Sequence, residues 1–174
     1  VTASVNAHHL AATDEAIGNY NTLFKTNPPL RTQSDIDALI KAIQDNTIDT
    51  ITSQHLPHEN DCKKLEFDKA DFGIIGLETS FALANTALHT KVTTEQIIRL
   101  FSENPRKIAG IPTHTIQEES KADLTLFSPD FKWIFTEQHI ASTSKNTPFI
   151  GKQLVGKSLG VINNGQIFLA PELR

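Results

Sequence analysis

The spacing of apolar residues in the first part of the chain predicts a strand, a helix and a second strand. Residues 1–5 and 48–53 alternate β-branched with small or polar residues, which is typical of short strands. Between them, apolar residues recur at helical spacing, at Ile36, Leu39, Ile40 and Ile43. Ser34, with Asp37 three residues later, is expected to cap this helix. The order of these elements predicts a crossover between parallel strands.

Further helices are predicted in the middle of the chain. Residues 72–77 lead into a helix expected over about 78–88. Thr93 and Gln96 form a capping box for the next helix, which Asn104-Pro105 is expected to end, with Pro105 starting a short helical turn closed by Gly110.

From about residue 116 the apolar period becomes two, which predicts strands. The segments are residues 123–127, 131–136 and 160–169. Asn164-Gly165 is a two-residue turn signal, so the last segment is expected to be a hairpin. The sequence therefore predicts an α/β part, residues 1–115, and a small β part, residues 116–174.

Composition favours one ordinary globular domain and excludes some partners. The chain has 174 residues, of which 39% are hydrophobic and 21% charged, and its net charge is −4. It has no run of Lys or Arg long enough to follow a phosphate backbone, so nucleic acid is not expected as a partner. No apolar run approaches the roughly 18 residues of a membrane-spanning helix, and no secretory signal is recognisable, so no membrane association is expected.

Two further features concern location and completeness. The single cysteine, Cys62, in a segment expected to be a polar loop, fits a reducing cytoplasm better than a disulfide-stabilised protein. The sequence contains no Met and opens in a predicted strand. We expect it to be a piece of a longer polypeptide, with removal of a tag as the alternative.

Several polar residues follow the predicted parallel strands. His8-His9 comes after the first strand, and His55 and His58 come after the second, where catalytic groups gather in (β/α)₈ barrels. Because consecutive residues of a strand face opposite ways, at most one of His8 and His9 is expected to point inward. The segment Asn27–Arg31 is either a proline-stiffened loop that presents an amide and a guanidinium to a carboxylate, or a structural turn.

Other histidines and self-contained motifs add little. His89, His114 and His139 have no spaced partners and are expected to be structural or exposed. The sequence contains no His-x-His pair, no Gly-rich phosphate loop and no nucleophile elbow.

Four segments, in order, resemble successive blocks of the bacterial-type dihydroorotases of the amidohydrolase superfamily. They are residues 1–10, 25–31, 48–58 and 72–79, and residues 144–151 add a fifth likeness. The resemblance implies an α/β fold: a partial (β/α)₈ TIM barrel of the metal-dependent amidohydrolase type. This chain would supply the last two barrel strands and helices and the C-terminal part of a small β-sandwich.

The resemblance also places one residue at a catalytic position. Gln54 stands where the family block Asp-His-Ala-Pro-His has its Asp, which binds metal and shuttles the proton. A carboxamide has no proton to exchange near neutral pH, and proton transfer contributes roughly 10²–10⁴-fold to such reactions. The other zinc ligands of the family would lie upstream of Val1. The family uses zinc, but no metal site is expected for this chain alone.

The remaining site residues match the family's ligand-holding positions. Asn27 and His58 resemble side chains that grip the dihydroorotate ring and its carboxylate, and Phe72-Gly73 resembles the backbone segment that pairs with the ring amide. The expected ligands are dihydroorotate and carbamoyl aspartate, which the family interconverts in pyrimidine biosynthesis.

Three interpretations of function remain open from the sequence. The chain is a fragment of an active dihydroorotase, inactive by itself; or it is an inactive pseudo-dihydroorotase that acts as a scaffold, for instance for aspartate carbamoyltransferase; or it is a proteolytic product. Two barrel strands leave a sheet edge and apolar helix faces uncovered, so the expected partner is the missing N-terminal half of the barrel or a second copy.

Overall fold

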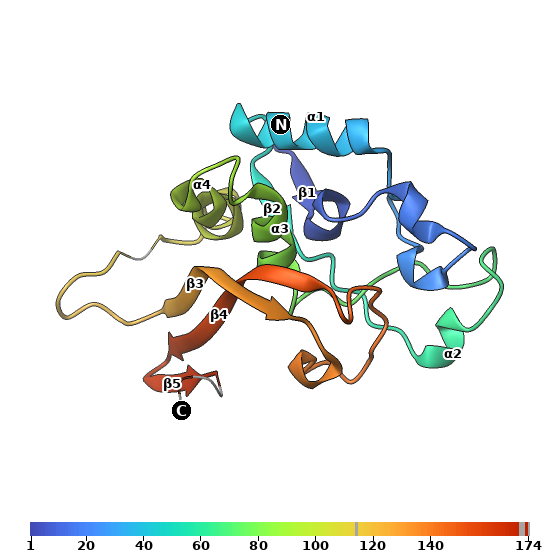
Figure 1. Cartoon of the computed structure of the whole chain (residues 1–174). Coiled ribbons are helices and arrows are strands. Elements are labelled where there is room, and N and C mark those ends of the chain that lie inside the picture. The colour runs from blue at the N-terminus through green and yellow to red at the C-terminus, as the bar shows by residue number, and fades with distance from the viewer. Residues whose placement is uncertain (114, 171–172, 174) are drawn as a thin grey trace.

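The computed structural model describes residues 1–113, 115–170 and 173, so His114 lies outside the described residues. The helices are α1 (Gln33–Gln44), α2 (Asn60–Lys63), α3 (Ser80–Leu88), α4 (Thr94–Ile98) and α5 (Asn104–Ile108). The strands are β1 (Ser4–Asn6), β2 (Thr50–Thr52), β3 (Leu124–Ile134), β4 (Gln153–Asn163) and β5 (Gln166–Leu169). Short 3-10 helices lie at Ala7–Leu10, Asp14–Ile17, Thr22–Phe24 and Glu137–His139, and Arg99–Glu103 is a π-helix. In Figure 1, α1 crosses the top beside the N-terminus, and β5 lies at the bottom beside the C-terminus.

The predicted crossover is confirmed. β1 and β2 pair in parallel, with Val5 opposite Ile51, and α1 connects them. Both strands have three residues and are shorter than predicted; β2 covers the centre of its predicted segment, whereas β1 covers the end of its segment and extends to Asn6. Past β2 the parallel direction continues as a single bridge between His55 and Ile74. The segment 72–77 is therefore held beside the end of β2.

Helix α1 begins earlier than predicted. Thr32, not Ser34, caps it: the Thr32 side chain accepts from the Asp35 amide, and the Asp35 carboxylate accepts from the Thr32 amide at 3.0 Å. The sequence holds two overlapping capping patterns, Thr32 with Asp35 and Ser34 with Asp37, and the first one satisfies the exposed amides of the first turn. The helix still buries Ile36, Ile40 and Ile43, as its apolar spacing predicts.

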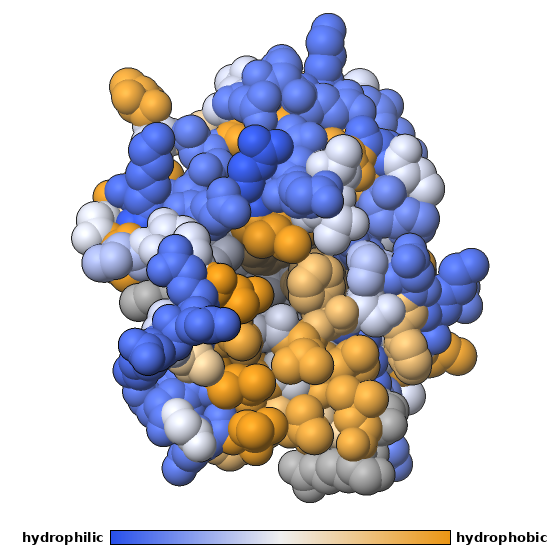
Figure 2. Space-filling model, turned by 90° about the vertical axis from the view of Figure 1, so that its left-hand side faces the viewer, coloured by the Kyte–Doolittle hydropathy of each residue, from blue (hydrophilic) through white to orange (hydrophobic). Residues whose placement is uncertain are grey.

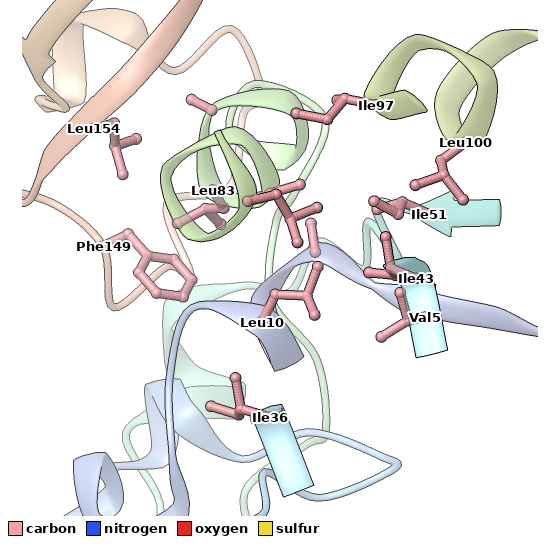
Figure 3. Close-up of a cluster of buried hydrophobic side chains, with 14 of the residues drawn as sticks. Val5, Leu10, Ile36, Ile43, Ile51, Leu83, Ile97, Leu100, Phe149 and Leu154 are labelled. Carbon is pink, nitrogen blue, oxygen red and sulfur yellow. The ribbon is translucent and has the colours of Figure 1, made fainter. Parts of the chain in front are cut away.

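Helix α3 is the centre of the core. It buries residues on several sides, namely Ala82, Leu83, Ala84, Asn85 and Leu88, which is typical of a helix enclosed by other elements. Figure 3 shows Leu83 with Phe149 and Leu154 on one side and Leu10 on the other. One cluster of buried apolar side chains thus joins the α/β elements to the C-terminal strands. Full burial of a side chain such as Leu88 contributes about 1.5–3 kcal/mol to folding.

Strands β3, β4 and β5 form an antiparallel sheet, and the predicted hairpin at Asn164-Gly165 is confirmed. The two segments predicted at 123–127 and 131–136 are one strand, β3, whose register shifts between Ser128 and Lys132. Pro129 lies in this irregularity, where its missing amide removes no regular ladder bond. The division of the chain at residue 115 stays a prediction.

Two local predictions are wrong. The chain does not end its helix at Asn104-Pro105, because the π-helix Arg99–Glu103 leads directly into α5. The wider π turn leaves room for a proline without an amide donor. Cys62 lies in the short helix α2 and not in a loop.

None of the helices in the described residues is both long and apolar enough to span a bilayer.

Candidate ligand site

Gln54 lies just after β2 and is held by hydrogen bonds on both sides of its amide. Its Oε1 accepts from Asn6 Nδ2 at 2.7 Å, and its Nε2 donates to the Asn27 carbonyl at 2.7 Å. Its backbone has φ = 43°, in the left-handed region that residues other than glycine rarely adopt. Such conformations are sustained by surrounding contacts and are frequent at functional sites. The structure therefore holds Gln54 in a fixed place between two loops.

Asn27 belongs to a loop that is hydrogen-bonded to His9 of the 3-10 helix Ala7–Leu10. The exposed Asn27 contributes its carbonyl to Gln54, and the next carbonyl, of Pro28, lies 3.0 Å from His9 Nε2. Thr26 Oγ1 also donates to the Pro28 carbonyl at 2.8 Å. The loop is thus restrained from both sides, which leaves the Asn27 side chain facing solvent.

His58 binds the segment that contains Phe72 and Gly73. His58 Nε2 lies 2.8 Å from the Phe72 carbonyl, and Gly73 has φ = 134°. A Cβ on Gly73 would lie 2.6 Å from Leu56 Cδ2, so both the backbone angle and the close approach require glycine. The Gly73 amide donates to the Lys25 carbonyl at 2.9 Å, which connects this segment to the Asn27 loop.

The predicted site residues are therefore brought together. Gln54 contacts Asn27, Lys25 of the same loop contacts Gly73, and Phe72 contacts His58. The positions form a continuous arc of loops at the end of the parallel strands. Their roles toward a ligand stay a prediction.

Asn146 is a site residue that sequence reasoning missed. It is buried, its Oδ1 accepts from the His58 amide at 3.2 Å, and its Nδ2 donates to the Leu56 and Gly73 carbonyls at 2.9 and 3.3 Å. One amide side chain thus ties the His58 loop to the Phe72-Gly73 segment. The only available signal was its place inside the segment 144–151 that resembles the family.

Two buried lysines lie beneath the same segment. Lys25 Nζ donates to the Asp68 and Ala70 carbonyls, and Lys63 Nζ donates to the Asp71 and Gly73 carbonyls. Lys25 Nζ also lies 4.5 Å from the centre of the Phe72 ring. Burial lowers the pKa of Lys63, and the nearby Lys25 charge adds to this effect. Nothing in the spacing of the sequence indicated that these lysines are buried.

The expectation that at most one of His8 and His9 points inward is wrong. Both lie in the 3-10 helix Ala7–Leu10, both are buried, and their ring centres are 4.5 Å apart. The alternation of faces in a strand does not apply to a tight helical turn. Burial, followed by the proximity of His9, lowers the pKa of His8 to about 3. Among the described residues, His8 Nε2 has no hydrogen-bond partner.

His55 has a structural role in this chain. Its Nδ1 accepts from the Gly76 and Leu77 amides at 3.1 and 3.2 Å. An accepting Nδ1 places the ring hydrogen on Nε2. His139 contacts Thr136 and packs on Trp133, and His89 is exposed, in agreement with expectation for both.

A cavity of about 550 Å³ lies away from this arc, between the segment after β1, α1, α3 and β4. Its lining includes Leu10, Ile40, Leu83 and Phe149, and none of the predicted site residues among those that the structure describes. The lining mixes apolar side chains with polar ones such as Gln33, Thr86 and Lys91, but the described residues that form it include none of the groups that the resemblance assigns to a ligand. We therefore place the candidate site at the arc and not at the larger cavity.

Comparison with known proteins identifies the family. The model of the amidohydrolase family matches residues 2–167, so the chain belongs to this family. Metal dependence is general in the family. The fold is accordingly part of a (β/α)₈ barrel together with part of a small sheet, which confirms the predicted fold class.

The similar curated proteins are dihydroorotases, which confirms the resemblance. The one from a Thermoanaerobacter species is 43% identical over 169 residues, and the one from Chlorobaculum tepidum is 41% identical over 175 residues. These matches cover 96% and 97% of this chain but 39% of each relative. The chain thus spans well under half the length of the curated relatives it matches.

Solved structures agree on the fold. L-Hydantoinase from Arthrobacter aurescens matches with a TM-score of 0.87 at 26% identity, over 96% of this chain and 39% of that one. An inactive dihydroorotase-like domain of a Chaetomium thermophilum multifunctional protein matches with a TM-score of 0.65 at 19% identity, over 98% of this chain and 46% of that one.

Proposed function

We propose that this chain forms the ligand-holding part of a dihydroorotase-type barrel in pyrimidine biosynthesis and does not hydrolyse dihydroorotate by itself. Similarity to dihydroorotases over 96% of the chain supports the first half of this proposal. The observation that carries the second half is the carboxamide of Gln54, fixed between Asn6 and Asn27.

The chemistry at Gln54 lacks a proton-transfer group. Dihydroorotate hydrolysis needs a base to take a proton from the attacking water and an acid to return it to the departing amide nitrogen. Both hydrogen-bonding ends of the Gln54 amide are already engaged, and an amide does not ionise near neutral pH. Gln54 can orient a neighbouring group, but it cannot accept the proton.

A family-type zinc ion does not fit at this position. Zinc prefers thiolate, imidazole and carboxylate donors, and the Gln54 oxygen already accepts from Asn6. His55 Nδ1 is likewise occupied by two backbone amides. We therefore assign no zinc to Gln54 in this chain alone.

The surroundings of the arc suit a ligand that carries a carboxylate. Lys25 and Lys63 place two positive charges beneath the Phe72-Gly73 segment, and buried charges are screened less than surface charges. The Asn27 side chain is exposed beside them and offers both a donor and an acceptor. Dihydroorotate and carbamoyl aspartate both combine carboxylate and amide groups.

The test compares Gln54→Asp with Gln138→Asp, a matched change at an exposed position. The purified chain is expected to bind dihydroorotate and to show no hydrolysis. Binding is measured by chemical-shift changes in NMR spectra. In a complete barrel that supplies the upstream zinc ligands, Gln54→Asp is expected to raise the hydrolysis rate by roughly 10²-fold or more, and Gln138→Asp to leave it unchanged. Turnover by the purified, unaltered chain would contradict the proposal.

A second candidate is an assembly role without catalysis, favoured by an uncovered apolar surface. Figure 2 shows apolar atoms gathered over the lower half of one face. Exposed apolar side chains of β3 to β5 include Leu126, Val161, Ile167 and Phe168. The occupant that we propose is the upstream part of the barrel, since the dihydroorotase relatives are much longer than this chain.

A sedimentation experiment distinguishes the upstream part of the barrel from two other partners. In the absence of the upstream part, a second copy of the chain covers the apolar surface; association with aspartate carbamoyltransferase is the scaffold alternative. Mixing the chain with each protein and measuring the sedimentation coefficient distinguishes them. We place the chain in the cytoplasm, where a lone free cysteine remains reduced.

A further inference from the structure

We propose that His58, Cys62 and Asp71 form a binding site for a divalent cation of the zinc class. One ligand atom from each side chain lies within 4.8 Å of the other two. This site is separate from the zinc position of the family at Gln54, and it does not depend on the proposed dihydroorotase-type function. It shares His58 with the ligand positions that the resemblance predicts, so a cation bound at Nδ1 would take the place of a ligand contact at that nitrogen.

The orientation of the His58 ring points a lone pair at the Asp71 carboxylate. His58 Nε2 lies 2.8 Å from the Phe72 carbonyl, which can only accept, so Nε2 carries a hydrogen. In the neutral ring the opposite nitrogen, Nδ1, is then an acceptor, and it lies 3.5 Å from Asp71 Oδ2. Two acceptors that face each other at this distance leave room for a cation between them.

This arrangement is the one that metal-binding histidines usually show. A ligating imidazole typically donates its other ring hydrogen to a carbonyl or carboxylate, which fixes the tautomer and the ring orientation. The Phe72 carbonyl fills that role for His58. The His58 loop is fixed further by Asn146, which accepts from the His58 amide.

Cys62 completes the donor set. Its thiol hydrogen-bonds to Asp71, and this bond is the main reason that the pKa of Cys62 is raised; the charges of Glu59 and Asp61 add to it. A raised pKa argues against a reactive thiolate and leaves the sulfur protonated until a cation displaces the proton. One thiolate, one imidazole and one carboxylate are donors that Zn²⁺ and Cd²⁺ prefer over Mg²⁺ or Ca²⁺.

The surrounding charges partly oppose each other. Lys63 is close enough to Asp71 and Cys62 to feel their charges, and its ammonium opposes a bound cation. The Lys63 ammonium is, however, engaged by the Asp71 and Gly73 carbonyls, which turns it toward the backbone. Glu59 and Asp61 supply negative potential at the sulfur.

The ligand atoms need only a small movement to reach bonding distance. Tetrahedral zinc ligands with bonds of about 2.0–2.3 Å lie roughly 3.3–3.8 Å apart. The Asp71 side chain is 53% exposed and is free of core packing, so it can approach the other two groups. Three protein donors leave a fourth position for water or an external ligand.

The experiment uses Cd²⁺ as the probe, because Cys62 is the only cysteine of the sequence. Any thiolate-to-Cd²⁺ charge-transfer absorption must then come from this residue. We expect the band to saturate at one Cd²⁺ per chain and to disappear in Cys62→Ser. Binding is expected to release one proton, since RSH and M²⁺ give RS–M⁺ and H⁺; an indicator dye in weak buffer measures it.

The other two ligands are tested by affinity. Asp71→Asn is expected to weaken Cd²⁺ binding about tenfold or more, because loss of a direct ligand costs at least as much as loss of an outer partner. Asp68→Asn, an exposed carboxylate of the same loop, is the matched control and should bind with unchanged affinity. His58→Gln is expected to behave like Asp71→Asn, and is compared once its circular dichroism matches that of the unaltered chain.

A further measurement uses Zn²⁺ directly. Zn²⁺ is expected to slow alkylation of Cys62 by iodoacetamide in the unaltered chain and in Asp68→Asn, and much less in Asp71→Asn. Equal Cd²⁺ affinity in the unaltered chain and Asp71→Asn would show a lone thiolate and overturn the proposal. The absence of a saturating charge-transfer band would also overturn it.

Discussion

At the scale of single residues, the candidate site depends on polar side chains that are buried together with their partners. Asn146, Lys25 and Lys63 all end on backbone carbonyls of the loops that carry the predicted ligand contacts. Such bonds fix loop geometry because a buried carbonyl left without a donor is costly. The residues that shape the site are therefore not the ones expected to touch the ligand.

Replacement of Asn146 tests this dependence. Asn146→Ala removes the partner of the His58 amide and of the Leu56 and Gly73 carbonyls. We expect the free energy of unfolding, measured by urea denaturation, to fall by about 2–3 kcal/mol. Asn19→Ala, at an exposed loop position, should change it by less than about 0.5 kcal/mol. Similar losses for the two variants would argue against a fastening role.

His8 predicts a pH dependence of stability. Its folded-state pKa is about 3, whereas an unfolded histidine has a pKa of about 6.5. Between these values the unfolded chain binds a proton that the folded chain does not. The contribution of His8 is therefore complete above pH ~6.5 and is lost as the pH falls toward 3, by about 1.4 kcal/mol per pH unit.

The measurement compares unfolding free energies at pH 7 and pH 5. In the unaltered chain the free energy of unfolding falls from pH 7 to pH 5. In His8→Leu this fall should be smaller by about 2 kcal/mol. Exposed His89 supplies the control, and His89→Gln should keep the full drop. An unchanged drop in His8→Leu would show that His8 is not the responsible group.

At the scale of elements, the clearest difference between sequence and structure concerns the start of α1. Thr32→Ala should destabilise the protein by about 1 kcal/mol, because it removes the side chain that accepts from the Asp35 amide. Ser34→Ala lies inside the helix and should change stability by less than about 0.5 kcal/mol. Thermal unfolding of both variants decides between the two caps. A larger destabilisation in Ser34→Ala than in Thr32→Ala would identify Ser34 as the cap.

Much of the fold could be predicted because local patterns determine it. The apolar spacing around Ile36 and Ile40 gives α1, and Asn164-Gly165 gives the β4–β5 hairpin. The parallel pairing of β1 and β2 follows from a helix between two strands. The helix and the hairpin need only neighbours in the sequence, and the strand pairing follows from the single helical connection between β1 and β2.

The rest depends on contacts between distant segments. Asn146 reaches a loop 88 residues earlier in the chain, and Lys25 bonds to carbonyls 43 and 45 residues later. The 3-10 turn at His8-His9 is fixed by packing around it and has no periodic signature. For the site, the resemblance assigned Gln54 to a catalytic position and Asn27 and His58 to ligand-holding positions, but the groups that hold their loops became visible only in three dimensions.

At the scale of the whole molecule, the chain leaves apolar side chains of the antiparallel sheet open to solvent. Ile167 and Phe168 of β5 are both more than half exposed, at 64% and 57%. Exposed apolar surface of this kind usually marks an interface or leads to aggregation. This chain covers 39% of its dihydroorotase relatives, and the proposed occupant of this surface is the upstream part of the barrel.

This surface predicts self-association of the isolated chain. We expect the weight-average mass from light scattering to rise with protein concentration, and Ile167→Lys to bring it close to the mass of a monomer. The matched control is Leu65→Lys, an exposed apolar residue just after α2, which should leave association unchanged. A monomer at every concentration in the unaltered chain would contradict this expectation.

The bond between Asn146 and the His58 loop has a consequence for how such proteins can be recombined. The predicted ligand contacts all lie within residues 27–73, yet the Asn146 amide that holds two of their loops comes from the segment after β3. Swapping the last third of the chain between homologues would exchange Asn146 and its surroundings without the loops to which Asn146 is hydrogen-bonded. These two stretches should be inherited as a unit, and chimaeras joined between them should lose ligand affinity even when every contact residue is retained.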